Sequence, residues 1–156
     1  MKQNACCFTG HREIAPRQYF CVKYNLIKIV EQLYKQGVTE FYAGGALGFD
    51  TVAAQTVLAF KKEYSDIKLH LILPCKEQAD KWPQTSKEIY NEILKQADDV
   101  TYVSEHYSKY CMQNRNRMLV DSSGICVCYL EKNFGGTAYT VNYAKKKNLQ
   151  IINIIK

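Results

Sequence analysis

The chain has 156 residues, of which 47% are hydrophobic and 23% are charged, a composition that excludes a disordered chain and suits one globular domain over residues 1–156. No apolar run approaches membrane-spanning length, and the run at residues 5–8 is too short for a secretory signal, so we expect a cytoplasmic protein with no membrane partner. The formal net charge of +6 favours an anionic partner, such as a nucleotide or a nucleic acid.

Short apolar runs alternate with helical patterns along the whole chain. The runs that read as strands are residues 5–8, 40–43, 68–73, 99–103, 125–130 and 151–155. Between them, apolar residues recur at helical spacing, in stripes that include Leu26 with Leu33, Val57 with Phe60, Ile89 with Ile93 and Ala97, and Val141 with Ala144. The alternation predicts an α/β fold, in which helices cover both faces of a mainly parallel sheet.

Glycines and polar residues follow three of the predicted strands. The stretches are Thr9-Gly10-His11-Arg12, Gly44-Gly45-Ala46-Leu47-Gly48-Phe49-Asp50 and Gly135-Gly136-Thr137. Glycine lets a backbone approach a phosphate closely, and the start of a following helix offers unpaired N–H groups. Because parallel strands end at one edge of a sheet, the three turns predict a shared ligand crevice. Neither the G-x-G-x-x-G pattern nor the Walker G-K-[ST] pattern is present.

Seven cysteines, an odd number, lie mostly in apolar runs. Cys126 and Cys128 would face one side of a strand, where small buried hydrophobic side chains are commoner than metal ligands. No further Cys or His stands at metal-ligand spacing. We therefore expect no metal, no disulfide framework and no cofactor.

Taken together, these motifs resemble the YpsA family of the SLOG superfamily. The resemblance runs in order over nearly the whole chain, through the three glycine turns, Pro74 with residues 78–82, residues 115–117 with residues 120–121, and residues 140–144. It implies a Rossmann-like, three-layer α/β/α fold that binds or senses a nucleotide or a nucleotide-derived ligand. The superfamily also includes the LOG phosphoribohydrolases and the DprA/Smf DNA-processing proteins.

The resemblance leaves open whether the protein catalyses a reaction. LOG enzymes release a base from a nucleoside monophosphate, with the motif Pro-Gly-Gly-x-Gly-Thr, a following Glu and an Arg from a helix. Residues 134–140 match that motif in shortened form and Arg115 resembles the helical Arg, but Thr140 and Val141 stand in the region of the Glu. The missing carboxylate favours a binding protein over a hydrolase. For a hydrolase, the candidate catalytic residues are Asp50, Arg115 and Asp121.

The predicted ligand-binding residues are Thr9, Gly10, His11, Arg12, Gly44, Gly45, Ala46, Gly48, Asp50, Arg115, Asn116, Gly135, Gly136 and Thr137. We expect Arg12 to bind a phosphate, the alternative being a surface ion pair with Glu13. For His11, acid–base chemistry and a hydrogen bond that orients the loop stay equally open.

Other polar residues have plain structural interpretations beside the functional ones. Asp50 could accept a hydrogen bond from a ribose hydroxyl, although helix capping alone is favoured, and Thr137 could bind phosphate or cap the last helix. Asp121 is as well explained by a helix-end turn as by orienting Arg115. Trp82 is expected to pack over the sheet, and His70 to be structural.

The expected partner is thus a nucleotide-type small molecule. Contact with single-stranded nucleic acid is an alternative, which requires aromatic residues interleaved with basic ones on one face. The nearest match to that pattern is Tyr102, Tyr107 and Tyr110 with Lys109. A homodimer also stays open.

Overall fold

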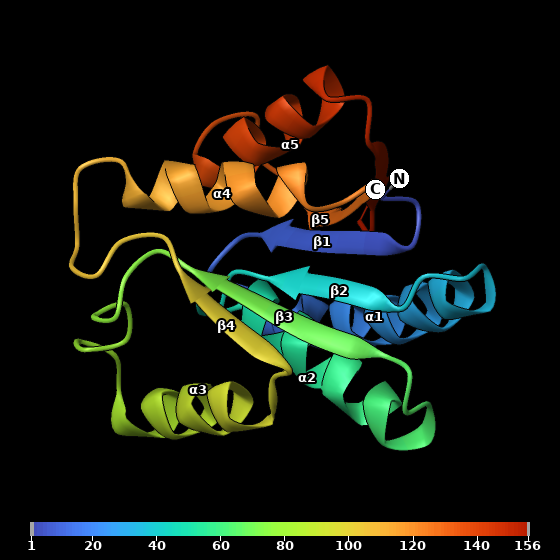
Figure 1. Cartoon of the computed structure of the whole chain (residues 1–156), viewed down its shortest axis with the longest axis horizontal. Coiled ribbons are helices and arrows are strands. Elements are labelled where there is room, and N and C mark those ends of the chain that lie inside the picture. Colours follow the sequence, from blue (N-terminus) through green and yellow to red (C-terminus); the bar gives the residue numbers. More distant parts are fainter. Residues whose placement is uncertain (1, 156) are drawn as a thin grey trace.

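The computed structural model describes residues 2–155. Strands and helices alternate as β1 (Ala5–Gly10), α1 (Pro16–Lys35), β2 (Glu40–Ala43), α2 (Phe49–Glu63), β3 (Lys68–Leu73), α3 (Gln84–Gln96), β4 (Asp99–Tyr102), α4 (Cys111–Asp121), β5 (Ile125–Tyr129), α5 (Gly136–Lys146) and β6 (Gln150–Asn153). The strands form one sheet in the order β4-β3-β2-β1-β5-β6, and every neighbouring pair is parallel. Figure 1 shows this arrangement, which confirms the predicted α/β, Rossmann-like architecture.

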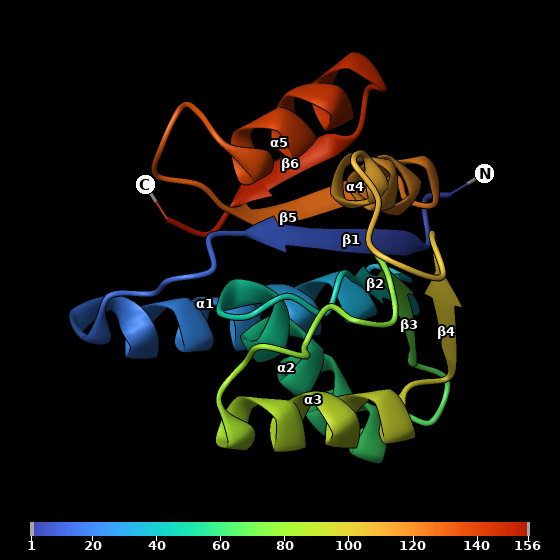
Figure 2. The ribbon, with the colours of Figure 1, turned by 90° about the vertical axis from the view of Figure 1, so that its left-hand side faces the viewer.

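Helices cover both faces of the sheet, as Figures 1 and 2 show. On one face, α1, α2 and α3 pack over a large core that contains Phe8 and Phe41. On the other face, α4 and α5 enclose a smaller core that contains Cys7, Cys126 and Cys128. Successive strand residues point to opposite faces, and residues 5–9 of β1 are all buried, so β1 is covered on both sides, in keeping with the apolar run at residues 5–8. The two strand cysteines are buried, as predicted.

At the central strand β1, the order in which strands are added to the sheet changes direction. From β1 the chain adds β2, β3 and β4 on one side, and it then returns to place β5 on the other side of β1. The loops after β1 and β5 therefore diverge, and in such sheets ligands bind at the carboxyl edge between diverging loops. Gly44 comes directly after β2 and Gly135 follows β5 by a short loop, so the predicted common edge is confirmed.

Several details of the predicted elements were wrong. The last strand covers Gln150–Asn153 and not residues 151–155. The strands predicted at residues 99–103 and 125–130 each end one residue earlier. Strand β1 extends to Gly10, so Thr9 and Gly10 belong to the strand. Ile89 is 41% exposed, and α3 instead buries Tyr90 and Ile93. The helix is turned toward Tyr90 because that ring packs edge-on against Trp82, with centroids 5.1 Å apart, and so buries a larger apolar area. The same contact confirms that Trp82 is a packing residue.

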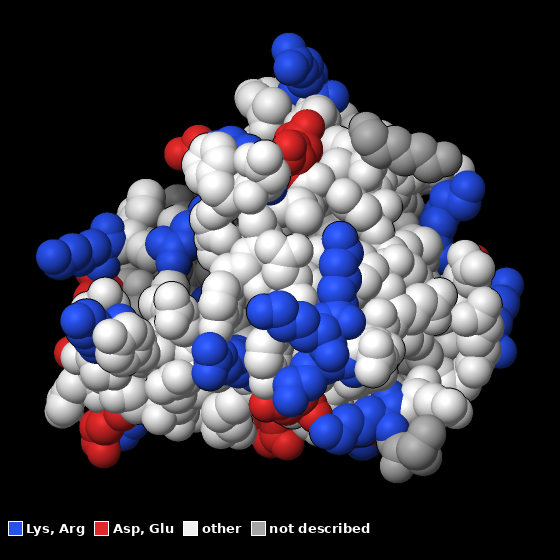
Figure 3. All heavy atoms as spheres, turned by 90° about the horizontal axis from the view of Figure 1, so that it is seen from above, with Lys and Arg blue, Asp and Glu red and all other residues white. Residues whose placement is uncertain are grey.

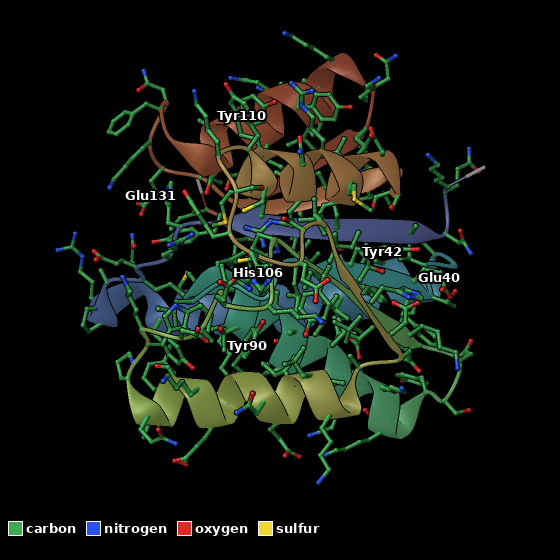
Figure 4. All side chains as sticks on the ribbon, turned by 60° about the vertical axis from the view of Figure 1, so that its left-hand side comes forward. Glu40, Tyr42, Tyr90, His106, Tyr110 and Glu131 are labelled. Atoms are coloured by element: carbon green, nitrogen blue, oxygen red, sulfur yellow. The ribbon has the colours of Figure 1, made fainter. Side chains whose placement is uncertain are left out.

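A histidine links three strands at the amino-terminal end of the sheet. Nε2 of His70 lies 2.7 Å from Oε1 of Glu40, and Nδ1 lies 2.9 Å from Oδ2 of Asp99. Tyr42 stacks on the ring, with centroids 4.5 Å apart. Burial opposes protonation of the ring, but the hydrogen bonds and charges of the two carboxylates outweigh it and raise the pKa of His70. Figure 4 shows Glu40 and Tyr42 on β2, well away from Glu131 after β5.

Across residues 2–155, no helix combines the length and the apolar character needed to cross a bilayer.

Candidate functional site

A crevice of about 460 Å³ opens at the carboxyl edge of the sheet, between the diverging loops that follow β1 and β5. Its walls come from β1 and the loop after it, the turn after β2, helix α4, and the loop that leads into α5. The lining residues are Phe8, Thr9, Gly10, His11, Arg12, Ala46, Asp50, Met112, Arg115, Asn116, Leu119, Lys132, Phe134, Gly135, Gly136 and Thr137. This volume lies in the range of pockets that hold small ligands.

The crevice brings together the predicted ligand-binding residues except Gly44, Gly45 and Gly48. Gly45 and Gly48 have φ angles of +70° and +78°, so the backbone of the turn itself requires glycine there. In addition, a Cβ at position 48 would overlap the backbone of Arg12. The turn after β2 therefore reaches the crevice through Ala46 and Asp50.

Asp50 and Arg115 are the buried charged residues of the crevice, with 6% and 4% of their surface exposed. Oδ2 of Asp50 accepts a hydrogen bond of 3.2 Å from the N–H of Ala46. Nη1 of Arg115 donates to the carbonyl oxygen of Gly44, and its Nε donates to Oδ1 of Asn116 over 2.8 Å. A Cβ at position 44 would lie 2.5 Å from Nη1 of Arg115 and 3.0 Å from Oδ2 of Asp50. The absence of a side chain at Gly44 thus leaves room for both charged groups.

The surroundings of Asp50 place its titration near neutral pH. Burial raises the pKa of Asp50 to about 6, against the opposing charges of Arg115 and Arg12 and the hydrogen bond from Ala46. Burial also lowers the pKa of Arg115, while Asp50 acts in the opposite sense. The crevice therefore holds a carboxyl group that can exchange a proton under physiological conditions.

Helices α2 and α5 begin beside the crevice, and no side chain caps the N-terminus of either. Helix α2 begins at Phe49 with Gly48 as its N-cap, and α5 begins at Gly136 with Gly135 as its N-cap. The helix-cap interpretation of Asp50 and Thr137 was therefore wrong, because each lies two positions after the N-cap residue of its helix. The first turn of α5 also contains no acidic residue, so its unpaired N–H groups face the crevice uncompensated.

Basic side chains lie at the mouth of the crevice. Arg12 is exposed, and among residues 2–155 no carboxylate lies within 4.0 Å of its guanidinium, so the ion pair with Glu13 does not form. Nε2 of His11 accepts a hydrogen bond of 2.9 Å from the N–H of Glu131, which is the loop-orienting contact considered for this residue. Burial and the charge of Lys132 lower the pKa of His11, so the ring is neutral at physiological pH.

Five lining residues were absent from the predicted ligand-binding set: Phe8, Met112, Leu119, Lys132 and Phe134. Lys132 and Phe134 lie within three residues before Gly135, so their place beside the glycine turn could have predicted that they line the crevice. Met112 reaches the crevice because of the way α4 is turned, which its sequence does not reveal.

Asp121 lies outside the crevice. It is the last residue of α4, and its carboxylate accepts a hydrogen bond of 2.9 Å from the hydroxyl of Tyr143. The guanidinium of Arg115 is held by Gly44 and Asn116 instead. The structure therefore gives Asp121 no part in orienting Arg115.

The outer surface of α4 and α5 is basic, and Figure 3 shows Lys and Arg side chains gathered on this side of the molecule. Arg117 is exposed, as expected, and its guanidinium lies 5.9 Å and 5.5 Å from the ring centroids of Tyr139 and Tyr143. On the loop before α4, Nζ of Lys109 lies 5.3 Å from the ring centroid of Tyr110, the residue labelled in Figure 4. Cations and aromatic rings are therefore paired at both places.

Comparisons with known sequences identify relatives over most of the chain. The YpsA family model, described as the YspA SLOG family, matches residues 7–155. The SPbeta prophage-derived protein YoqJ of Bacillus subtilis is 33% identical over 141 residues, which are 82% of each chain. A UPF0398 protein of Brevibacillus brevis is 34% identical over 106 residues, which are 66% of this chain and 56% of that protein. The chain thus spans little more than half of the second relative.

Two solved structures of DNA processing protein A share the fold. The Helicobacter pylori protein, studied for its single-stranded DNA binding mode, superposes with a TM-score of 0.68 at 19% identity, covering 96% of this chain and 64% of that one. The Streptococcus pneumoniae protein gives a TM-score of 0.67 at 19% identity, covering 94% and 48%. At this identity the likeness concerns the fold alone. The family model, matched over almost the whole sequence, shows that this protein belongs to the YpsA family of SLOG proteins.

Proposed function

We propose that the crevice binds a phosphorylated, nucleotide-type ligand whose phosphate lies against the first turn of α5. Membership of the SLOG family supports nucleotide or nucleic acid binding in general. The position proposed for the phosphate rests on Gly136, because neither the backbone conformation nor the packing requires a glycine there.

Gly136 is the first residue of α5, and its φ angle lies outside the left-handed region. A Cβ at this position would have no heavy atom within 4 Å. Alanine would therefore fit the structure, and it is the better helix former by up to about 1 kcal/mol. By contrast, Gly10 is needed because a Cβ there would overlap the ring of Phe49. A ligand that approaches the backbone closely explains why position 136 has no side chain.

The charges around α5 suit a phosphate. The uncapped N–H groups of the first turn carry a partial positive charge, and no acidic residue in that turn compensates it. Arg12 and Lys132 line the same crevice and supply two cations, of which the guanidinium can bind a phosphate with two hydrogen bonds. Asp50 can accept a hydrogen bond from a ribose hydroxyl, and the exposed ring of Phe134 offers a surface for a base.

Calorimetry with the four common ribonucleoside monophosphates and their nucleosides tests the proposal. Gly136→Ala should fold at least as stably as the wild type, yet bind the monophosphates about tenfold or more weakly. Asn142→Ala, at an exposed position farther along α5, serves as the control and should bind like the wild type. Equal affinities for wild type and Gly136→Ala, or no binding of any monophosphate to the wild type, would contradict the proposal.

Hydrolysis of the N-glycosidic bond is a second candidate function, because Asp50 is the one acidic residue among the described residues that line the crevice. Its pKa of about 6 suits a group that gives or takes a proton. Chromatography of nucleoside monophosphates after long incubation would detect the released base. Release that Asp50→Asn abolishes, with folding intact, would assign a hydrolase. The absence of release would leave a binding protein.

Binding of single-stranded nucleic acid is a third candidate, supported by the exposed rings of Tyr107 and Tyr110 with Lys109 between them. This loop leads into α4, whose Met112 lines the crevice. Fluorescence anisotropy of a labelled oligothymidylate would detect such binding, which should weaken as salt is added. Tyr110→Ala should reduce it, whereas Tyr19→Ala, on a distant part of α1, should not. Affinity unaffected by Tyr110→Ala would argue against this function.

A further inference from the structure

Helix α1 carries two apolar stripes. The buried stripe is formed by Val22, Leu26, Val30 and Leu33. A second stripe, the α1 ridge, consists of Phe20, Tyr24 and Ile27, which are 81%, 61% and 41% exposed. Their spacing of four and three residues places them along one side of the helix. A helix needs only one apolar stripe to pack against its own fold, so the α1 ridge is left for a partner.

An apolar groove lies beside the ridge, between α1 and α2. Figure 2 shows these two helices on the same face of the sheet. The volume of the groove is about 380 Å³. Ile27 of α1 and Val52, Ala59 and Phe60 of α2 provide the apolar lining. None of the residues that line this α1–α2 groove lines the crevice. The ridge and the groove are therefore adjacent parts of one surface, separate from the site described above.

The two ends of the groove carry opposite charges. Helices α1 and α2 run in the same direction, because each returns from the carboxyl end of one parallel strand to the amino end of the next. Lys23 lies in the first half of α1, and Glu63 is the last residue of α2. Both line the groove. The groove is thus positive at the end near the carboxyl edge of the sheet and negative at the other.

We propose that this face binds the same face of a second copy of the chain. A two-fold axis across the groove would bring the second α1 in antiparallel to the first, with the ridge of each copy in the groove of the other. Lys23 of each copy would then meet Glu63 of the other, so the opposite charges are satisfied twice. A ridge and a groove on one patch, with charges that reverse from end to end, form the self-complementary surface that an isologous dimer requires.

The association state of the full chain tests this surface. Sedimentation equilibrium from micromolar to hundreds of micromolar protein should show a reversible dimer. Tyr24→Glu, which places a charge on the ridge at an exposed position, should weaken association at least tenfold while circular dichroism shows unchanged folding. Tyr107→Glu makes the same change at a similarly exposed tyrosine outside the face and should leave the dimer intact. A wild type that stays monomeric throughout, or a Tyr24→Glu variant that still dimerises, would overturn the proposal.

Charge reversal tests the antiparallel arrangement separately. Lys23→Glu alone and Glu63→Lys alone should each weaken the dimer, because each places like charges together. The double variant restores opposite charges across the two-fold axis and should associate like the wild type. A double variant weaker than both single variants would rule out the pairing of Lys23 with Glu63 and with it the proposed orientation.

Discussion

The carboxyl group of Asp50 and the guanidinium of Arg115 both border the space that a side chain at Gly44 would occupy. They come from the start of α2 and the middle of α4, on opposite faces of the sheet, and the absence of a side chain at position 44 leaves room for both. Each is fixed by the backbone of the same turn, Asp50 by the N–H of Ala46 and Arg115 by the carbonyl of Gly44. The turn after β2 thus acts as the support for both buried charges.

Gly44→Ala should lower the free energy of unfolding by about 1–3 kcal/mol, because the new methyl group would lie 2.5 Å from Nη1 of Arg115 and 3.0 Å from Oδ2 of Asp50. Urea denaturation at pH 7 measures the change. Gly136→Ala is the matched control, since its methyl group contacts nothing and should not destabilise the protein. A Gly44→Ala variant as stable as the control would mean that the buried charges do not need this space.

The raised pKa of Asp50 predicts a stability that falls as pH rises. The folded state holds the proton up to about pH 6, whereas the unfolded chain releases it near the ordinary value of 3.8. Between these values the folded state binds more protons, so the free energy of unfolding should decline by about 3 kcal/mol between pH 4 and pH 7 and then level off. Asp50→Asn should lack this contribution. Urea denaturation of both proteins tests it, and a difference between them that does not vary with pH would refute the assignment.

Arg12→Ala should weaken the binding of nucleoside monophosphates much more than that of the nucleosides. A charge-assisted hydrogen bond is worth roughly 1.5–3 kcal/mol, which corresponds to about tenfold or more in affinity. Arg17→Ala removes the same charge outside the crevice and provides the control in calorimetry. Should both ligands lose affinity equally, Arg12 does not contact the phosphate.

Phe134→Ala should reduce affinity for AMP by roughly tenfold, the scale expected for loss of base stacking, while binding of ribose 5-phosphate stays unchanged. The motive is its position: the ring is 69% exposed and lines the crevice beside Gly135. Phe20→Ala removes an exposed ring far from the crevice and should affect neither ligand. Equal losses for AMP and ribose 5-phosphate would show that Phe134 shapes the loop and does not hold the base.

The His70 bridge predicts a pH dependence of the same sign as that of Asp50, because the folded-state pKa of each group is raised above its unfolded value. Because its folded pKa is raised above 6.5, the stabilisation is complete at pH values below the unfolded pKa and is lost as pH rises through the folded pKa. His70→Gln should therefore destabilise the protein most near pH 5.5 and least near pH 9, as measured by urea denaturation. Tyr42 would still cover a glutamine, which limits the packing change. A destabilisation independent of pH would show that the ring acts through packing alone.

Much of the fold could be predicted from the sequence, because each strand is a compact apolar run and a helical pattern follows each of the first five. The edge that gathers the glycine turns followed from the parallel arrangement. The strand order could not be predicted, since nothing in the fully buried strand Ile125–Tyr129 marks it as the neighbour of β1.

The candidate site was predictable where a residue follows a strand end and unpredictable where packing decides. Glycines 44, 48 and 136 look alike in the sequence, yet the first makes room for buried charges, the second permits a left-handed turn, and the third contacts nothing. Likewise, the burial of Arg115 depends on how α4 is turned, which a helix with both polar and apolar residues on its surface does not specify.

The central position of β1 has a consequence for how the chain is made. Cys6 pairs with Ile125, more than a hundred residues later, so the first strand to be synthesised receives its second neighbour among the last. Strands β1 to β4 can pair in order as they leave the ribosome, while the other edge of β1 stays unpaired until β5 emerges. An unfinished chain therefore exposes an apolar strand edge that can pair with foreign strands. The crevice, whose wall includes the loop after β5, cannot be complete before that loop has been synthesised.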